Sequence, residues 1–128
     1  MHQDGKIVIP NGLKPWPHEM RCARSLSVAG RNIEFVRPIS GDRVRSADLV
    51  MGGVLWEVKS PETTTVKSLQ RILRRACRQS PNIILDTARM TRLSDSAVER
   101  ELRRLKPLIK SIRRLILVTK SGDVVDIP

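Results

Sequence analysis

Two short apolar runs, residues 49–51 and 54–58, lie on either side of Gly52 and Gly53. Adjacent glycines suit a two-residue hairpin turn, because both central residues of such a turn take positive backbone angles. The pattern therefore predicts a β-hairpin over residues 48–59. With the glycines at its tip, the expected cross-strand pairs are Met51 with Val54, Val50 with Leu55, Leu49 with Trp56, and Asp48 with Glu57.

Three other stretches have the spacing of amphipathic helices, and four more have the apolar runs of strands. A helix is expected from about residue 17 to 29, with Glu19 on the same face as Cys22 and Leu26. Apolar residues at helical spacing predict a long helix over residues 63–79. A third helix is expected from Ser94, with a kink or division at Pro107. The further strands are expected at residues 32–36, 83–86, 113–119 and 123–127, the last two forming a hairpin.

The expected order of elements is α-β-β-β-α-β-α-β-β, which predicts an α/β (α+β) fold with a mixed central sheet flanked by helices. A strand, a helix and a strand in succession imply a right-handed crossover and a parallel pair. Residues 15–128 are expected to form one domain. Residues 1–14 form an N-terminal arm, in which Ile7 to Ile9 is either an edge strand or part of a mobile terminus.

Net charge is the feature of the composition that changes this picture. The 128 residues carry 24 Lys and Arg against 13 Asp and Glu, a net charge of +11. Such an excess indicates a polyanionic partner, because basic side chains that contact phosphates release counterions. No signal peptide and no apolar run of membrane length is found, so nucleic acid is favoured over a membrane. The chain has two Trp, one Phe and no Tyr, too few for a multi-base stacking platform.

The basic residues are concentrated on one face of the helix expected at residues 63–79. They recur at helical spacing, and no acid occurs within that range. The set consists of Lys67, Arg71, Arg74, Arg75 and Arg78. Such a face is suited to contact with a nucleic-acid backbone, with the apolar face of the helix on a sheet. The cationic face of the third helix is diluted by acids and is interpreted as a solvated surface.

The hairpin carries the candidate chemistry. Asp48 and Glu57, directly opposite each other, would repel unless a cation lies between them. Mg²⁺ is typically held by one or two carboxylates, with water and phosphate completing its coordination. Lys59 lies on the same face as Glu57 and adds a positive charge where a phosphate would bind. The set therefore predicts a metal-assisted phosphodiesterase; the alternative is a surface hairpin with a polar outer face.

Asp48 followed by Glu57-Val58-Lys59 resembles the PD-(D/E)XK nuclease signature. The wider pattern, which includes residues 16–19, 56–61, 78–82 and the hairpin at 115–127, is similar to the tRNA-nuclease domains at the C-termini of CdiA contact-dependent growth inhibition toxins. This resemblance covers about residues 15 to 128 and implies a restriction-endonuclease-like core. It also implies a tRNA substrate, a cognate acidic immunity protein and action in the cytoplasm of a target cell. Asp48, Glu57 and the Val58 carbonyl would bind Mg²⁺ or another divalent metal, with Glu19 as a further ligand.

Several residues keep two interpretations at this stage. Glu19 is either a metal ligand or a first-turn acid at the positive end of the helix dipole. Gln79 either faces the site or caps a helix, and His18 is either a base or a solvated neighbour. Asp86 is expected to hydrogen-bond its loop, and Arg43 and Arg45 either bind phosphate or keep a loop solvated. The alternative functions are a DNA endonuclease of the same superfamily and a non-catalytic nucleic-acid-binding module.

Overall fold

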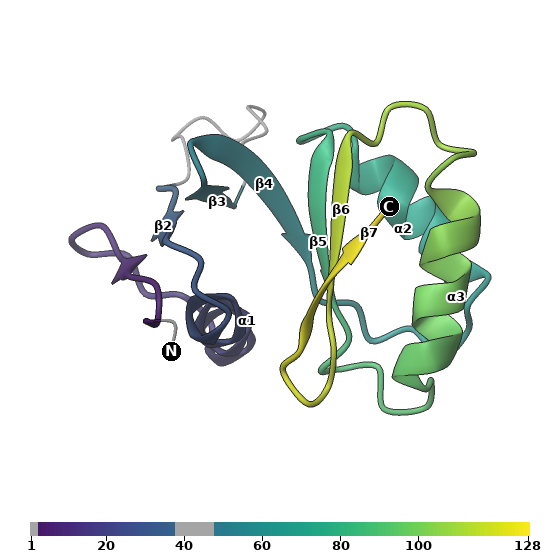
Figure 1. Cartoon of the computed structure of the whole chain (residues 1–128), viewed down its shortest axis with the longest axis horizontal. Helices are drawn as coiled ribbons and strands as arrows, with labels where there is room; N and C mark the ends of the chain where they lie inside the picture. The colour runs from purple at the N-terminus through teal and green to yellow at the C-terminus, as the bar shows by residue number, and fades with distance from the viewer. Residues whose placement is uncertain (1–2, 38–47) are drawn as a thin grey trace.

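The computed structural model describes residues 3–37 and 48–128, which form a seven-stranded mixed sheet and three helices (Figure 1). The spatial order of the strands is the same as their order in the sequence. The strands are β1 (Ile7–Val8), β2 (Ile33–Phe35), β3 (Leu49–Met51), β4 (Val54–Lys59), β5 (Asn82–Asp86), β6 (Arg114–Val118) and β7 (Val124–Ile127). The helices are α1 (Pro17–Val28), α2 (Ser68–Ala76) and α3 (Asp95–Leu105). The predicted mixed α+β fold is confirmed.

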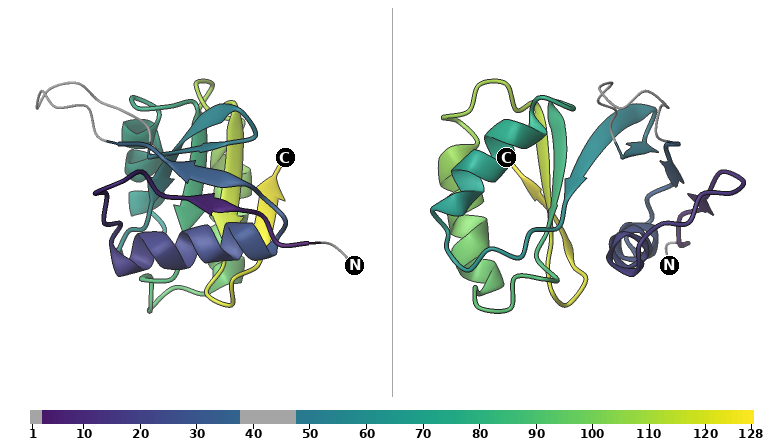
Figure 2. Two further views of the ribbon diagram at one scale, coloured as in Figure 1. Left: turned by 90° about the vertical axis from the view of Figure 1, so that its left-hand side faces the viewer. Right: turned by 180° about the vertical axis from the view of Figure 1, so that it is seen from behind.

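The sheet is strongly curled, and its helices lie on opposite faces (Figures 1 and 2). α1 lies inside the curl, where its residues Cys22, Ala23 and Leu26 pack with β2 to β4 and with the inner face of β5 and β6. α2 and α3 cover the other face of β5 to β7 and build a second core with it. Each face of the central strands is therefore apolar, as expected for strands buried on both sides.

The glycine hairpin has the predicted register. β3 and β4 pair antiparallel, with Leu49 opposite Trp56 and Met51 opposite Val54. Gly52 and Gly53 have φ angles of 62° and 75°, which residues other than glycine rarely adopt. Both angles are positive, as a type I′ turn requires. The turn chemistry therefore sets the register of the candidate site.

β4 changes partner along its length. Its first half, Val54 to Trp56, pairs antiparallel with β3, and its second half, Glu57 to Lys59, pairs parallel with β5. The parallel pairing is the one expected for a strand, helix and strand in succession. Figure 1 shows β4 arching between two groups of strands, β1 to β3 and β5 to β7. The change of partner opens the sheet at Glu57.

α2 is shorter than the helix predicted over residues 63–79. The chain before it is a turn, in which the Thr63 hydroxyl accepts from the Thr65 amide and Thr65 bonds to Ser68 through their hydroxyls. Such local hydrogen bonds compete with helix formation, and β-branched residues favour helices weakly. After Ala76 the chain tightens, because the Arg78 amide donates to the Arg75 carbonyl. The apolar residues keep helical spacing beyond both ends of α2, so spacing alone predicts a helix that is too long.

The N-terminal arm joins the sheet through an edge strand. β1 pairs parallel with β2, and the Gly5 amide donates to the Ser27 carbonyl at 2.7 Å. A Cβ on Gly5 would lie 1.8 Å from the Arg31 carbonyl oxygen, so only glycine allows this approach. Of the two interpretations of the arm, the structure has the edge strand.

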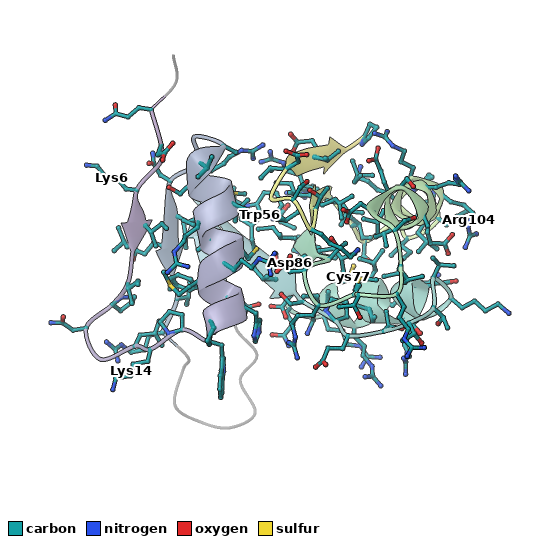
Figure 3. The ribbon with its side chains drawn as sticks, turned by 90° about the horizontal axis from the view of Figure 1, so that it is seen from below. Lys6, Lys14, Trp56, Cys77, Asp86 and Arg104 are labelled. Carbon is teal, nitrogen blue, oxygen red and sulfur yellow. The ribbon has the colours of Figure 1, made fainter. Side chains whose placement is uncertain are left out.

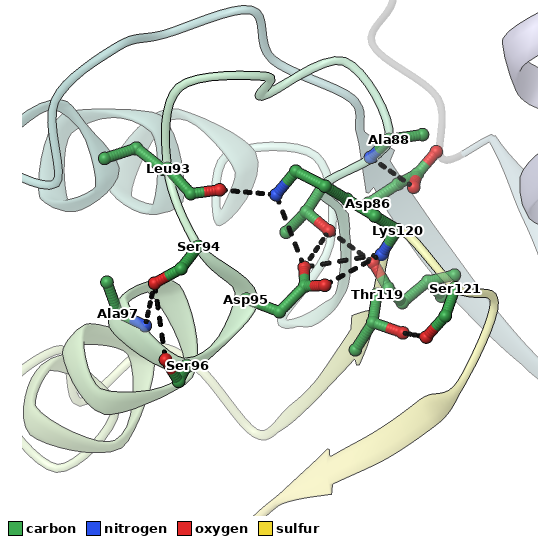
Figure 4. A network of polar contacts seen from close by, with 12 residues as sticks. Asp86, Ala88, Leu93, Ser94, Asp95, Ser96, Ala97, Thr119, Lys120 and Ser121 are labelled. Carbon is green, nitrogen blue, oxygen red and sulfur yellow. Dashed lines mark hydrogen bonds and ion pairs between the residues drawn. The ribbon is translucent and has the colours of Figure 1, made fainter.

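The loop between β5 and α3 is tied to the β6–β7 turn by one acid. Asp95 accepts from the Thr87 hydroxyl at 2.6 Å and from the Lys120 amide, and the Lys120 ammonium donates to the Leu93 carbonyl (Figure 4). Ser94 caps α3 by accepting from the Ala97 amide, although Ala97 cannot return the bond as a capping-box glutamate would. This network fixes the end of β5 beside the site.

Both cysteines of the chain, Cys22 and Cys77, are free thiols. No helix in the described ranges is long and apolar enough to cross a membrane.

Candidate active site

Asp48 fills the opening that β4 leaves when it changes partner. Its backbone amide donates to the Trp56 carbonyl at 2.9 Å, and its carboxylate accepts from the Val58 amide at 2.8 Å. Val58 lies two residues beyond Trp56, the last residue paired with β3, so the Asp48 side chain replaces a strand partner there. This placement fixes the carboxylate against the middle of β4.

Glu57 is buried beside Asp48, and Lys59 reaches it along the strand. The Lys59 ammonium lies 3.2 Å from Glu57 Oε2, and the glutamate side chain is 5% exposed while that of the lysine is 34% exposed. Glu57 Oε1 is buried without a hydrogen-bond partner. An unpaired buried carboxylate oxygen is costly, so this atom marks a place suited to a cation or a proton.

The two carboxyl groups share a raised affinity for protons. Burial, then the neighbouring charge of Asp48, raises the pKa of Glu57 to about 7, against the opposing effect of Lys59. Burial likewise raises the pKa of Asp48, although the Val58 amide, Glu57 and Lys59 counteract it. Each carboxyl group also affects the pKa of the other. Two neighbouring buried acids that favour their protonated forms make a site that a cation can occupy in place of a proton.

Strand pairing shows which face the pair occupies. Glu57 and Lys59 pair with Ile83 and Leu85 of β5, and both of these pack in the core beneath α2 and α3. Paired residues of neighbouring strands project to the same side of a sheet. Lys59 and Glu57 therefore project toward the face that carries α2, as the shared face predicted from the alternation requires.

Glu19 borders the same site from the opposite face. It lines a pocket of about 190 Å³ together with Asp48, and its charge contributes to the raised pKa of Asp48. One of its oxygens, Oε1, accepts from the Trp16 amide at 2.6 Å and so caps the start of α1. Glu19 is therefore an acid at the start of α1, as one of its two interpretations predicted, and it also lines a pocket with Asp48. Its role as a metal ligand stays a prediction.

Asp86 is a buried acid that sequence reasoning assigned only to its loop. It accepts from the Ala88 amide at 3.1 Å, as expected, but also from the Ser60 hydroxyl at 3.2 Å. Burial raises its pKa, while Arg21 and His18 of α1 lower it. Figure 3 shows Asp86 between α1 and the strands of the other half. His18 is therefore placed near Asp86, and Asp86 holds the residue that follows Lys59.

The predicted basic face of α2 is present and continuous. A shallow hollow of about 410 Å³ runs along it, lined by Lys67, Gln70, Arg71, Arg74, Arg75 and Arg78. α2 also contacts β4. Gln79 lies beyond the helix, where its backbone amide donates to the Ala76 carbonyl, and it lines neither this hollow nor the Asp48 pocket. Arg43 and Arg45 lie outside the described residues.

The donor set for a metal is small. Within residues 3–37 and 48–128, no three His, Cys, Asp or Glu side chains are grouped so as to hold a metal ion. Asp48 and Glu57 form a pair, and Glu19 stands at the edge of the pocket with one oxygen used by its cap. A two-carboxylate site suits Mg²⁺, which keeps several waters.

Comparison with known proteins assigns the chain to a family. The family of the contact-dependent growth inhibition CdiA C-terminal domain matches residues 45–124, more than half of the chain and the whole segment that holds Asp48, Glu57 and Lys59. The chain belongs to this family. It is a CdiA C-terminal toxin domain of contact-dependent growth inhibition. Comparison with curated proteins gives no match.

A solved structure has the same fold as this CdiA domain. It is a CdiA-CT/CdiI toxin and immunity complex from Burkholderia pseudomallei, with a TM-score of 0.69 and 17% sequence identity. The alignment covers 96% of this chain and 98% of that chain. At this identity the likeness establishes the fold of the CdiA domain, including the β1 edge and α1 that lie outside the family match.

Sequence reasoning missed two residues of this CdiA domain that border the site, Asp86 and Trp16. Asp86 ends a run that is buried throughout, and an acid in that place could have signalled a buried role. Trp16 entered the sequence analysis only as part of the pattern at residues 16–19. Its exposure depends on the packing of α1, which no pattern in the sequence reveals.

Proposed function

We propose that this CdiA C-terminal domain is a metal-assisted ribonuclease of the PD-(D/E)XK superfamily that cleaves tRNA in the cytoplasm of a target cell. The observation that supports this best is the grouping of Asp48, Glu57 and Lys59 where β4 changes partner. These three residue types at this spacing are the signature that the sequence resembles. The buried Oε1 of Glu57 has no partner and so costs stability, which supports a functional role for the grouping.

Asp48 and Glu57 would hold the divalent ion, and Glu19 would reach it directly or through water. The paired acids and the free Glu57 oxygen fit such an ion, because a cation would compensate the burial of the Glu57 charge and its repulsion with Asp48, which together raise the pKa of Glu57. When bound, Mg²⁺ would supply positive charge to the phosphate that is attacked. The protein itself fixes both carboxylates, one through the Val58 amide and the other through Lys59.

Lys59 would stabilise the transition state. Its ammonium lies at the edge of the site and is partly exposed, so it can meet a phosphate while one side stays paired with Glu57. A donor aimed at charge that develops on the pentavalent phosphorus contributes most when its position is fixed beforehand. Asp86 contributes to that fixing, since it hydrogen-bonds Ser60 at the end of β4.

The basic face of α2 would bind the substrate backbone. α2 lies on the face of the sheet toward which Glu57 and Lys59 project. None of the five cations along it is paired with an acid among the described residues. Cations free of such pairs are available to phosphate oxygens. An RNA strand lying along α2 would then lead toward β4, which α2 contacts.

A cognate immunity protein is the expected protein partner. The similar structure from Burkholderia pseudomallei is a toxin and immunity complex. With a net charge of +11, this domain would attract an acidic partner that covers the α2 face or the site. Such a partner would block both substrate binding and turnover.

The reaction is tested by incubating the wild-type domain with total tRNA, ribosomal RNA and plasmid DNA, each with Mg²⁺ or EDTA. Asp48→Asn serves as the matched inactive variant, because it keeps the size and a hydrogen-bond acceptor. We expect discrete tRNA fragments from the wild type with Mg²⁺ and none from the variant. Cleavage of plasmid DNA alone would show a DNA endonuclease of the same superfamily. Binding of RNA without cleavage of any substrate would show a non-catalytic module.

If tRNA cleavage persists in EDTA but Asp48→Asn abolishes it, the reaction needs Asp48 and does not need a metal ion. RNA can be cleaved through its own neighbouring 2′-hydroxyl, in which case the carboxylates would act as acid and base.

A further inference from the structure

Trp16 is the exception among the aromatic residues of the described chain. Its residue is 68% exposed, whereas Trp56 is fully buried and Phe35 nearly so. A large ring left in water is a loss of about 1.5–3 kcal/mol of burial that folding could have gained. A single exposed apolar side chain is common, but Trp16 also lines a pocket, and an aromatic side chain at a pocket is typical of a ligand site.

The backbone of Trp16 is fixed although its ring is exposed. Pro15 and Pro17 flank it, its amide donates to Glu19 Oε1 at 2.6 Å, and its carbonyl accepts from the Met20 amide at 3.0 Å. Trp16 also occupies the N-cap of α1 and makes no side-chain cap there, where Ser, Thr, Asp or Asn would stabilise the helix. Trp16 thus departs from two tendencies at one fixed position: its aromatic ring is exposed, and its side chain does not cap the helix. Such departures are typical of a functional residue.

The ring stands at a pocket that adjoins the site. The pocket measures about 190 Å³ and has a mixed lining, in which Lys14, Glu19 and Asp48 are charged. The apolar walls come from Leu13, Pro15, Phe35 and Val36. Figure 3 shows Lys14 on the segment that leads into α1. The volume suits one flat heterocycle and excludes a base pair within its helix.

We propose that Trp16 and this pocket bind a single unpaired nucleobase next to the phosphate that is cleaved. The base would stack on the Trp16 ring, and Lys14 would contact a flanking phosphate. Exposed aromatic rings stack with any base. A base can enter the pocket only when it is extruded or single-stranded. The proposal rests on the proposed nuclease function, and it makes the substrate an unpaired segment of RNA rather than a duplex.

The surroundings of the ring favour a base over a protein partner. The pocket ends at Asp48, the acid on which the proposed reaction depends, so whatever enters it meets the reacting group. An immunity protein needs only to cover such a pocket. A nucleotide beside the cleaved bond would lie within reach of it, because Asp48 lines the pocket.

The test is a binding titration that does not depend on turnover, made in a Lys59→Ala background. The probes are a single-stranded oligoribonucleotide, its duplex, and a ribose-phosphate chain of equal length that lacks bases. Tryptophan emission reports binding, and Trp16→Phe in the same background isolates the contribution of buried Trp56. Leu108→Ala, which removes another exposed apolar side chain remote from the pocket, is the matched control for surface loss.

We expect single-stranded RNA to quench Trp16 emission, and the base-free chain and the duplex to quench it much less. Trp16→Ala should weaken single-strand binding by about 5- to 150-fold, the size of one stacked base. Trp16→Phe should restore most of that affinity, and Leu108→Ala should leave it unchanged.

Equal affinity of Trp16→Ala and its parent for single-stranded RNA, without quenching, would overturn the proposal. Loss of binding to an immunity protein alone would overturn it too and would assign the ring to that partner. These results are separate from the failure of the nuclease function, which appears as absence of cleavage by the wild type in the substrate panel.

Discussion

The two halves of the sheet are built differently, and the candidate site lies where they meet. On one side, β1 to β3 are strands of two or three residues around α1, and several of their neighbours are exposed. On the other side, β5 to β7 are longer, every residue of β5 is buried, and α2 and α3 cover them. The first half supplies Glu19 and Asp48, while the second supports Glu57 and Lys59 through β5.

One strand connects these two unlike halves of the sheet. β4 (Val54–Lys59), together with Asp48 beside it, is the joint between them. β4 belongs to both halves, and its partners change at Glu57. A regular sheet would have satisfied the Val58 amide with a backbone carbonyl and left no room for a side chain. The change of partner gives that amide to Asp48 instead. The site is therefore a consequence of joining two unlike halves.

The largest effect on stability should come from breaking the joint at Trp56. Its buried ring packs with both halves, its indole donates to the Met51 carbonyl at 3.1 Å, and Arg114 of β6 lies over it at 5.1 Å. Trp56→Ala should lower the free energy of unfolding by about 3–5 kcal/mol. Leu55→Ala, the exposed neighbour, should change it by about 0.5 kcal/mol or less. Urea denaturation of both variants checks this, and similar losses would contradict it.

A substitution at Gly5 should disturb one half only. An added Cβ would meet the Arg31 carbonyl oxygen, so Gly5→Ala should cost about 1–3 kcal/mol as β1 is pushed away. The Ile33 amide, which donates to the Lys6 carbonyl, should then exchange its hydrogen faster, while β5 amides keep their protection. Hydrogen exchange measures both, and equal acceleration in β5 would show that the halves unfold as one unit.

The acids at the joint should make stability depend on pH. The pKa of Glu57 is about 7 in the folded chain against 4.5 for a free side chain. The folded state therefore holds more protons between these values, and the free energy of unfolding falls as pH rises from about 4.5 to 7. A loss of about 1–2 kcal/mol is expected once partial solvation is allowed for.

Glu57→Gln is the variant that isolates this effect. It should flatten the pH profile, leaving a weaker fall in the same direction from Asp48 and Asp86, whose pKa values are also raised. Thermal melting from pH 4.5 to 8 provides the measurement. A profile that rises with pH in the wild type would contradict the placement of Glu57.

The smallest expected effect sharpens the contrast between two helices of the second half. Arg103 and Arg104 of α3 are paired with Glu99 and Glu101, whereas α2 has no acid. Replacing Arg74 and Arg78 with Ala should reduce the salt dependence of single-stranded RNA binding by about 1.4 in log–log slope, ~0.7 per phosphate contact. The double variant of Arg103 and Arg104 should change the slope far less. Equal changes would mean that charge alone, and no particular face, binds RNA.

Much of this arrangement could be predicted from the chain. The paired glycines and the alternation at residues 49–59 fixed the hairpin and its register, because turn chemistry and side-chain period are local. The cationic face of α2 followed from spacing alone. The partner change of β4 could not be predicted, since alternation tells which side a residue faces and not which strand lies beside it.

The burial of Glu57 and the exposure of Trp16 could not be predicted for the same reason. Glu57 is almost fully buried and Trp16 is exposed, the reverse of what each residue type favours. Both follow from where α1 and β4 lie relative to each other. The ends of α2 escaped because the hydroxyls of Thr63 and Thr65 compete with the helix.

The most direct test of the central claim is single-turnover cleavage of tRNA by Lys59→Ala beside Lys67→Ala. The two variants remove the same charge, one at the joint and one on the α2 face. Lys59→Ala should slow the cleavage step by about 10²–10³-fold at saturating domain while it binds RNA as the wild type does. Lys67→Ala should keep the rate and weaken binding slightly. Equal cleavage rates for the two variants would contradict the assignment of the joint as the active site.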